Sequence, residues 1–235
     1  MSRVRITART LVALMAACAS LAGPQLAAQS LDQLSRRDAT AGLKAALDKG
    51  AIAAVASLGR PDGFWANPKV RIPLPEHLQR ARMALKFMGK GDEVDALELA
   101  VNRAAEQAVP EAKTLLTNAV KSISVDDAKQ ILRGGDDSVT QFFKAKTASE
   151  LSERFLPIVR RVTDKSGLAQ QYNALASQGV SIGLIKPEQA TIERYVTQKA
   201  LDGLYTMIAE EEKKIRANPV AAGSDIIRRV FGALN

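Results

Sequence analysis

Apolar residues recur every three or four positions along most of the chain, which is the spacing that places side chains on one face of an α-helix. The first such stretch runs from Asp38 to Ser57, and others begin at Pro75 and Asp92. No stretch alternates apolar and polar residues as a half-buried β-strand does, and no segment repeats elsewhere in the chain. The pattern therefore predicts an all-α protein, with a single multi-helix domain of bundle-like or orthogonal packing.

Helix-starting and helix-breaking residues divide the middle of the chain. Asp92 is placed to cap a long helix, and Pro110 must bend or break that helix because proline lacks the amide hydrogen. Ser124 and Asp127 have the spacing of a capping box, which predicts the start of a short helix. Gly134–Gly135 predicts the end of that helix.

The same signals appear in the second half of the chain. Thr147–Glu150 has the Thr-x-x-Glu spacing of a capping box and predicts a helix start, and Gly167 predicts the end of that helix. Thr191 predicts the start of the clearest helix, which ends near Asn218–Pro219. An amphipathic helical segment is expected over residues 224–234.

Residues 60–75 are too rich in proline, glycine and asparagine for a regular element, so they predict the longest loop. The loop contains Trp65, the only tryptophan, together with Phe64 and Arg71. Because long loops often carry function, Trp65 and Arg71 are candidate ligand-binding residues of a lid or docking surface. The alternative, which the burial of aromatic rings favours, is that Phe64 and Trp65 pack onto the helices.

The first residues have the parts of a secretory signal peptide in their usual order. Three arginines in the first ten residues supply positive charge, and Leu11–Ala22 is an uncharged run too short to span a bilayer. Ala28 is the small residue that a signal peptidase needs before the cut. We therefore expect residues 1–28 to be removed and residues 29–235 to form a periplasmic or secreted helical domain.

Cys18 gives a second interpretation of this leader. Small residues, Ala16 and Ala17, precede it, so lipidation at Cys18 would make the protein a lipoprotein, although Met15 is unusual at its position. Cys18 is the only cysteine, so a chain cleaved after Ala28 forms no disulfide. The exported domain must then depend on its apolar core.

Composition agrees with helices and adds a mild positive charge. Aromatic residues make up only 4% of the chain, and alanine, leucine and valine supply most of its apolar character. The formal charge is +8, and removal of the three leader arginines leaves 30 basic against 25 acidic residues, or +5. This excess favours solubility first and anionic lipid headgroups second. Export excludes cytosolic nucleic acid as a partner.

Few residues are available for metal or nucleophile chemistry. His77 is the only histidine and has no Gly-x-Ser-x-Gly motif to act with. Without a mature cysteine, the usual zinc sites and di-iron sites cannot be built. Asp136 and Asp137 follow two glycines, which is typical of one helix ending and another beginning. We expect no metal and no cofactor.

The helix from Asp92 carries polar residues opposite its apolar stripe. Asn102, Arg103 and Glu106 share this face, at spacings of three and four residues that allow side-chain contact. They form either an intrahelical network, which is the simpler interpretation, or the lining of a ligand pocket. All three are therefore candidate ligand-binding residues.

The helix from Thr191 places Glu211 and Glu212 at the edges of its apolar stripe. Glu212 can reach Arg216 one turn on, whereas Glu211 has only Ile215 there and is expected to need a tertiary partner. A buried pair of this kind is structural more often than catalytic, and Glu211 is also a candidate ligand-binding residue. The candidate partners of Glu211 are Arg103, Arg154 and Arg161.

Seven strings occur in a specific order along the chain: Gly59–Phe64, Val70–Pro75, Asn102–Ala112, Gly134–Asp137, Phe155–Val159, Tyr195–Leu204 and Ile208–Glu212. Together they resemble the bacterial domain-of-unknown-function 4197 family over essentially the whole mature chain. The resemblance implies an exported helical protein. It implies no activity, ligand or catalytic residue.

These observations favour a non-catalytic binding or structural module for a lipid or other apolar or amphipathic ligand, or for an envelope protein. One alternative is a carboxylate-dependent enzyme in which Glu106 or Glu211 is the base and Arg103 its electrostatic partner. The other is a peripheral membrane protein attached through residues 224–234 or through a lipidated Cys18.

Overall fold

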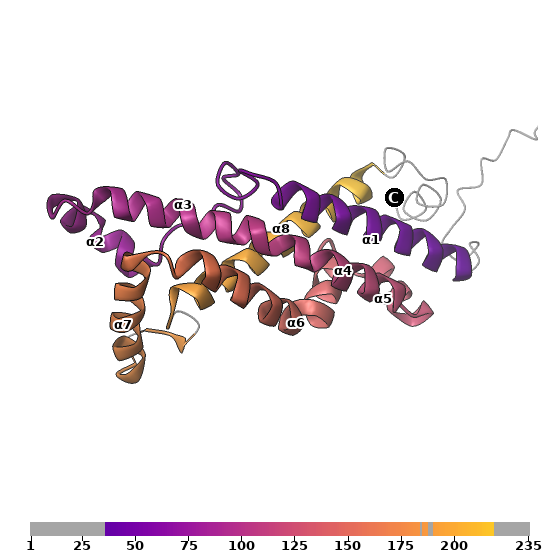
Figure 1. The fold of residues 1–235 in the computed structure, drawn as a ribbon. Coiled ribbons are helices and arrows are strands. Elements are labelled where there is room, and N and C mark those ends of the chain that lie inside the picture. Colours follow the sequence, from indigo (N-terminus) through magenta and orange to yellow (C-terminus); the bar gives the residue numbers. More distant parts are fainter. Residues whose placement is uncertain (1–35, 184, 188–189, 219–235) are drawn as a thin grey trace, which may run out of the picture.

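In a computed structural model, which describes residues 36–183, 185–187 and 190–218, every regular element of the described residues is helical (Figure 1). The all-α prediction is therefore confirmed, and no strand occurs in this part of the chain. The elements are α1 (Arg36–Leu58), α2 (Glu76–Phe87), α3 (Gly91–Ala108), the 3₁₀ turn η2 (Val109–Glu111), α4 (Ala112–Lys121), α5 (Val125–Arg133), α6 (Ser138–Thr163), α7 (Gly167–Ser181) and α8 (Ile192–Ala217).

The last described helix, α8, is the one against which the longest helices pack. It contacts α1, α3 and α6, and buried residues occur along it from Ile192 to Glu212. The body is elongated, with the turn between α2 and α3 at one end and α5 towards the other (Figure 1). Small residues allow the close approach of helices, and Ala104, Ala105 and Ala108 of α3 are fully buried.

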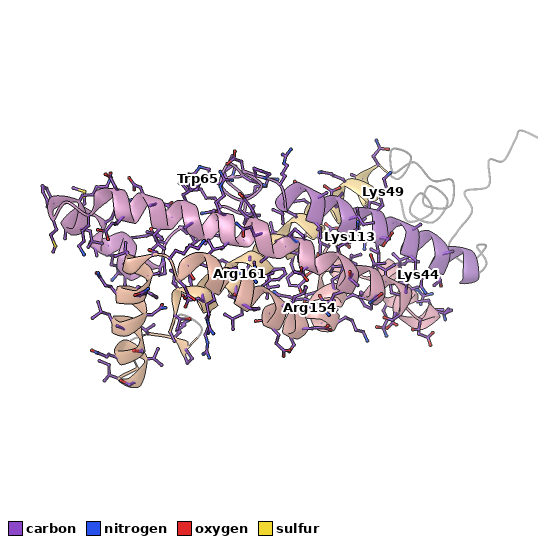
Figure 2. All side chains as sticks on the ribbon, in the orientation of Figure 1. Lys44, Lys49, Trp65, Lys113, Arg154 and Arg161 are labelled. Carbon is purple, nitrogen blue, oxygen red and sulfur yellow. The ribbon has the colours of Figure 1, made fainter. Side chains whose placement is uncertain are left out.

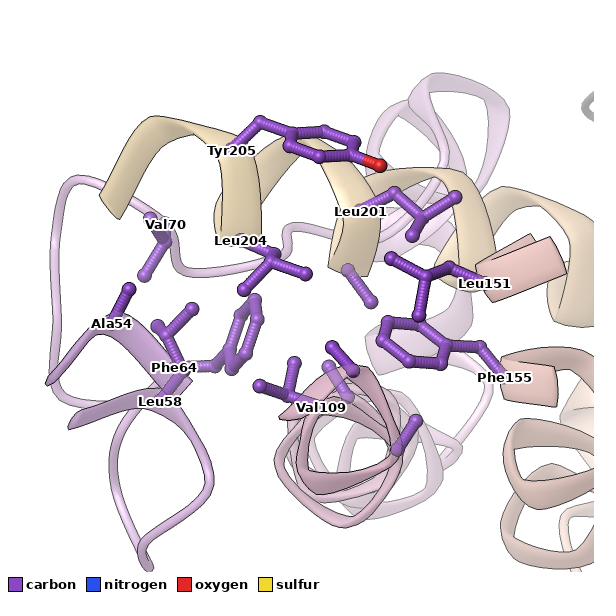
Figure 3. Packing of buried hydrophobic residues seen from close by; sticks show 14 of the residues in the cluster. Ala54, Leu58, Phe64, Val70, Val109, Leu151, Phe155, Leu201, Leu204 and Tyr205 are labelled. Carbon is purple, nitrogen blue, oxygen red and sulfur yellow. The ribbon is translucent and has the colours of Figure 1, made fainter. Parts of the chain in front are cut away.

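Phe64 reaches this core from the loop between α1 and α2. Its side chain is fully buried and lies near Leu58 and Leu204 (Figure 3). A Cβ atom added to Gly203 of α8 would lie only 2.6 Å from the ring carbon Cε1 of Phe64. The missing side chain at Gly203 therefore makes room for the aromatic ring.

Local sequence signals predicted three boundaries correctly. Pro110 lies in η2, which separates α3 from α4. Ser124 and Asp127 form the predicted capping box at the start of α5. Thr191 caps α8, since its hydroxyl oxygen accepts a hydrogen bond from the Arg194 amide.

The predicted helix start at Thr147 is wrong, because α6 continues through this position without interruption. The Thr147 hydroxyl lies 2.7 Å from the Phe143 carbonyl oxygen and 2.9 Å from the Tyr205 hydroxyl oxygen. A threonine hydroxyl that bonds back to the preceding turn is satisfied inside a helix. The contact with α8 thus replaces the expected cap.

Gly167 and Asp92 also have roles other than those predicted. Gly167 is the first residue of α7 instead of the end of α6, because Ser166 caps the new helix. α3 begins at Gly91, so Asp92 lies in its first turn and not at the cap position. There the carboxylate charge is still favoured by the helix dipole.

The predicted signal peptide, residues 1–28, and the predicted amphipathic segment, residues 224–234, lie outside the described residues. Among the helices that the structure does describe, none combines the length and the hydropathy that a bilayer crossing requires.

Replacement of Gly203 by alanine tests the contact with Phe64. We expect Gly203→Ala to lower the free energy of unfolding by about 1–3 kcal/mol, because the added methyl group overlaps a buried ring. Urea unfolding followed by circular dichroism measures the change. Gly167→Ala is the matched control, since a Cβ atom there meets nothing within 4 Å. A Gly203→Ala protein as stable as the wild type would contradict the packing.

Candidate functional site

The loop of residues 59–75 lies against one face of α3. We define the α3 polar face as Glu98, Asn102, Arg103 and Glu106. Three of these residues are buried, and Asn102 has no exposed surface at all. Buried polar side chains need hydrogen-bond partners, and the backbone of the loop supplies many of them.

Asn102 binds the loop backbone through both atoms of its amide. Oδ1 accepts a hydrogen bond from the Ile72 amide at 2.8 Å, and Nδ2 donates to the Ile72 carbonyl at 2.8 Å. Nδ2 also donates to the Glu98 carbonyl at 2.8 Å. Asn102 therefore satisfies two backbone groups of a residue that is itself buried.

Glu106 holds the first half of the loop. Its Oε1 accepts hydrogen bonds from the Phe64 amide at 3.0 Å and from the Trp65 amide at 3.1 Å. Its Oε2 accepts from Nη1 of Arg103 at 2.7 Å, and Nη2 of Arg103 donates to Asp62 at 2.7 Å. The carboxylate and the guanidinium together connect α3 to three neighbouring loop residues.

The turn held in this way is tight. Asp62 has a φ angle of 66°, in the left-handed region that few non-glycine residues adopt. A Cβ atom added to Gly63 would lie 2.4 Å from the Leu58 carbonyl oxygen, so glycine is required there. The ion pair between Arg103 and Asp62 stabilises a constrained backbone.

The candidate residues of the loop, Trp65 and Arg71, belong to the same cluster. The guanidinium of Arg71 lies 3.8 Å from the centre of the ring of Trp65, which Figure 2 labels, and the two make a cation–π contact. Arg71 also donates to Oε1 of Glu98 at 3.2 Å, and Arg82 of α2 donates to Oε2 of Glu98 at 2.9 Å. The hydrogen bonds that Arg82 donates to the Asp95 and Glu98 carboxylates raise the pKa of Arg82. Five of the six candidate residues therefore lie together.

The polar groups of the α3 polar face are used to bind the loop of residues 59–75. Glu106 already accepts three hydrogen bonds from protein groups and is 4% exposed. A general base must present its carboxylate to the proton that it removes. The geometry therefore favours the structural network over an open ligand pocket at Asn102, Arg103 and Glu106.

Glu211 lies outside the cluster, and the prediction of a tertiary arginine partner is wrong. Its Oε1 accepts from Nζ of Lys214, within α8, at 2.6 Å. Arg103 and Arg154 pair with other carboxylates, and Figure 2 shows Arg154 and Arg161 on α6. Glu211 is partly exposed at a hollow between α1 and α8, so a lysine at the surface is sufficient as its partner.

Glu212 is the buried glutamate of this pair. Its Oε1 accepts from Nη2 of Arg216 at 2.8 Å, as the spacing of one turn predicted, and from the Val139 amide at 3.4 Å. Arg216 also donates to Ser138 at 2.9 Å. Burial raises the pKa of Glu212, and the hydrogen bond from Arg216 opposes this effect. The pair fastens the end of α8 to the start of α6.

Another buried glutamate, Glu193, is not among the residues that the sequence analysis predicts. Its Oε1 accepts from the Thr163 hydroxyl at 3.0 Å and its Oε2 from Nδ2 of Asn173 at 3.0 Å. Asn173 in turn accepts from the Ile192 amide at 2.8 Å. Glu193 therefore connects α6, α7 and α8. Its position three residues before the buried Val196 was the available signal.

The metal candidates stay separate in the structure. His77, Asp136 and Asp137 are all exposed. Within the described ranges, no group of three or more histidine, cysteine, aspartate or glutamate side chains is placed to hold a metal ion.

One end of the molecule exposes large apolar side chains. Met83, Phe87 and Met88, at the end of α2, are 65%, 87% and 71% exposed. Met83 and Phe87 are four residues apart and therefore share a face of the helix. Leu175 of α7 and Ile182, which follows α7, are each 70% exposed. We call these five residues the apolar end.

A polar contact lies between residues that are close in sequence to the two parts of the apolar end. Nζ of Lys90, two residues after Met88, lies 3.5 Å from Oε1 of Gln171 on α7. Leu175 follows Gln171 by one helical turn. Figure 1 also shows α2 and α7 at the same end of the elongated body. The sequence of α7 contains no charged residue, so this helix adds an uncharged surface beside the α2 turn.

Comparisons with known proteins give one match. A family model described as a protein of unknown function (DUF4197) matches residues 33–232, which is most of the chain. No curated protein and no solved structure matches. The resemblance found in the ordered sequence strings is thereby confirmed.

Trp65 is the only tryptophan, so its fluorescence reports on the loop of residues 59–75. We expect Asn102→Ala to shift Trp65 emission to longer wavelength and to lower the free energy of unfolding by roughly 1–3 kcal/mol, because Ile72 loses both backbone partners. Emission spectra and urea unfolding measure these effects. Glu76→Gln, which removes only an exposed pair with Arg80, is the control. An unchanged emission spectrum would show that Asn102 does not hold the loop.

Glu212 gives a pH dependence of stability. Because burial raises its pKa above the ordinary value of 4.5, folding favours the protonated form. This contribution is complete below the unfolded pKa and is lost as the pH rises through the folded pKa. The free energy of unfolding of the wild type, relative to Glu212→Gln, should therefore be larger at about pH 4 than at about pH 7.

Urea unfolding of wild type and Glu212→Gln at both pH values measures this difference. The hydrogen bonds that Glu212→Gln loses change its free energy of unfolding by the same amount at both pH values. The test is therefore how the difference between wild type and variant changes with pH. A difference that grows between acidic and neutral pH would mean that Arg216 dominates over burial.

Proposed function

Because the chain belongs to the DUF4197 family of proteins of unknown function, we propose its role from its surface: it is a non-catalytic binding module that docks onto an amphipathic lipid surface through the apolar end. The proposed location is the periplasm or the secreted space, after cleavage near Ala28. Attachment through a lipidated Cys18 is the alternative and also brings the domain to a membrane. Both positions lie outside the described residues.

This proposal rests on one observation: the side chains of Met83, Phe87 and Met88 are all exposed to solvent. Contiguous exposed apolar side chains mark contact sites for proteins or membranes. Removal of one such side chain from water is favourable by about 1.5–3 kcal/mol. Three neighbours therefore supply enough free energy for a reversible contact, and the flexible methionines adapt to an irregular partner.

Shape and charge favour lipid as the occupant. The turn between α2 and α3 projects at one end of the body (Figure 1). A projecting turn is suited to insertion into a lipid bilayer, whereas a small molecule is bound in a concave pocket. Lys86 and Lys90 flank Phe87 and Met88 in the sequence. Lysine side chains can contact lipid phosphates while apolar neighbours enter the acyl region. An envelope protein with an apolar pocket is the alternative partner.

The carboxylate enzyme has less support. Arg103 and Glu106 bind the loop of residues 59–75, whereas Glu211 pairs with Lys214 at a separate surface of α8. No contact among the described residues joins Glu211 to the other two. A shared acid–base site would need such a contact.

Phe87→Glu tests the proposal with vesicles of phosphatidylglycerol and phosphatidylethanolamine. Purified protein without residues 1–28 should sediment with these vesicles, and Phe87→Glu should weaken binding by about tenfold or more, because an inserted aromatic ring is replaced by a charge. Circular dichroism confirms that the variant is folded.

Val125→Glu is the matched control, because it makes the same kind of change at an exposed apolar residue of α5, towards the other end of the body (Figure 1). It should bind vesicles like the wild type. The lipid proposal is wrong if the wild type does not sediment with the vesicles. It is also wrong if Phe87→Glu binds the vesicles as well as Val125→Glu does.

A further inference from the structure

A hollow of about 400 Å³ lies between α6 and α8 and is separate from the apolar end. Its volume is within the range of small-molecule sites, roughly 300–1,000 Å³. The lining consists of Ser152 and Leu156 from α6, Pro187, which precedes α8, and Arg194, Thr197 and Gln198 from α8.

Thr197 has the one buried side-chain oxygen or nitrogen atom that lacks a hydrogen-bond partner among the described residues. The residue is 3% exposed and lines the hollow. A buried hydroxyl without a hydrogen-bond partner destabilises the fold. A threonine side chain in a helix adopts either of two χ1 rotamers. Rotation from one to the other exchanges the positions of the hydroxyl and the methyl group. An acceptor in the hollow can therefore draw the hydroxyl towards itself.

The other polar groups of the hollow are mainly donors. Arg194 is exposed, and no ion pair joins its guanidinium to another residue in the described part of the chain. Ser152 carries a second hydroxyl without a side-chain partner there. Glu193, the acidic neighbour of Arg194, is bonded to Thr163 and Asn173 instead. The lining thus combines a free positive charge with hydroxyl donors.

The walls are apolar beside these donors. Leu156 and Pro187 offer hydrocarbon surface, and Gln198 uses its amide nitrogen to donate to Asp202 at 3.0 Å. A carboxylate fits the donors because Arg pairs with it by two parallel hydrogen bonds. A short hydrocarbon chain fits the wall.

We propose that the hollow between α6 and α8 binds a small amphipathic carboxylic acid. Arg194 pairs with the carboxylate, Ser152 and Thr197 donate hydrogen bonds to it, and Leu156 and Pro187 contact its chain. The site is independent of the proposed docking of the apolar end.

The test uses hexanoate as the probe, with the methyl groups of Leu156 and Thr197 observed by nuclear magnetic resonance in the purified protein. Hexanoate should shift both methyl signals and saturate them in the millimolar range. Arg194→Gln should weaken binding by about tenfold, because it removes the charge-assisted pair. 1-Hexanol, which has the chain without the charge, should bind as weakly to the wild type as hexanoate does to Arg194→Gln.

Thr197→Val supplies a second measurement, because it keeps the shape and removes the hydroxyl. It should weaken hexanoate binding and raise the melting temperature of the free protein, since an unsatisfied group is lost. Arg133→Gln, an exposed arginine on α5, is the control and should bind hexanoate like the wild type.

Three results would overturn the proposal. These are no saturable shift at Leu156 and Thr197, equal affinity of hexanoate for wild type and Arg194→Gln, and equal affinity of hexanol and hexanoate for the wild type. Vesicle binding through Phe87 should be unchanged in Arg194→Gln, so failure of either proposal is distinguishable from failure of the other.

Discussion

Backbone amide and carbonyl groups that leave water must find partners, and this requirement governs the loop of residues 59–75. The loop has no regular structure, yet its Phe64 ring enters the core beside Gly203. The ring can be buried there only if the surrounding backbone stays hydrogen-bonded. Asn102 and Glu106 provide these bonds. Polar residues of α3 thus make an apolar contact between the loop and α8 possible, and a face that resembles a catalytic cluster in sequence is part of the framework.

The other buried glutamates follow the same logic. Glu193 joins three helices through neutral donors, and Glu212 with Arg216 fastens the end of α8 to the start of α6. Breaking a buried pair is costly because it leaves a charge without compensation. These acids therefore connect segments that are distant in sequence. The surfaces that we propose for partners, the exposed apolar residues near Phe87 and the hollow beside Arg194, lie apart from these connections.

Sequence signals within one helical turn predicted the features that depend on hydrogen bonds within that turn. Helical periodicity gave the fold class, and Pro110 and Thr191 marked boundaries because their effects act within one turn. Thr147 misled because a contact with α8 replaced its capping role. Asn102, Arg103 and Glu106 were grouped correctly since they share a helix, but their loop partners lie 30 or more residues away in sequence. Glu211 and Glu212 lie on two edges of one apolar stripe, and the periodicity does not show which edge the start of α6 covers.

The position of α8 at the centre of the packing has a consequence for the order in which the chain acquires its shape. α1, α3 and α6 are all completed well before α8 along the sequence, yet each packs against it. Before α8 has been synthesised, the apolar faces of α1, α3 and α6 lack this common partner. Contacts between segments that are distant in sequence also form slowly, because a long loop must close first. The contacts of α1, α3 and α6 with α8 can therefore form only after residues 192–217 have been made. A chain that ends before α8 lacks these contacts and exposes apolar helix faces, which favours aggregation.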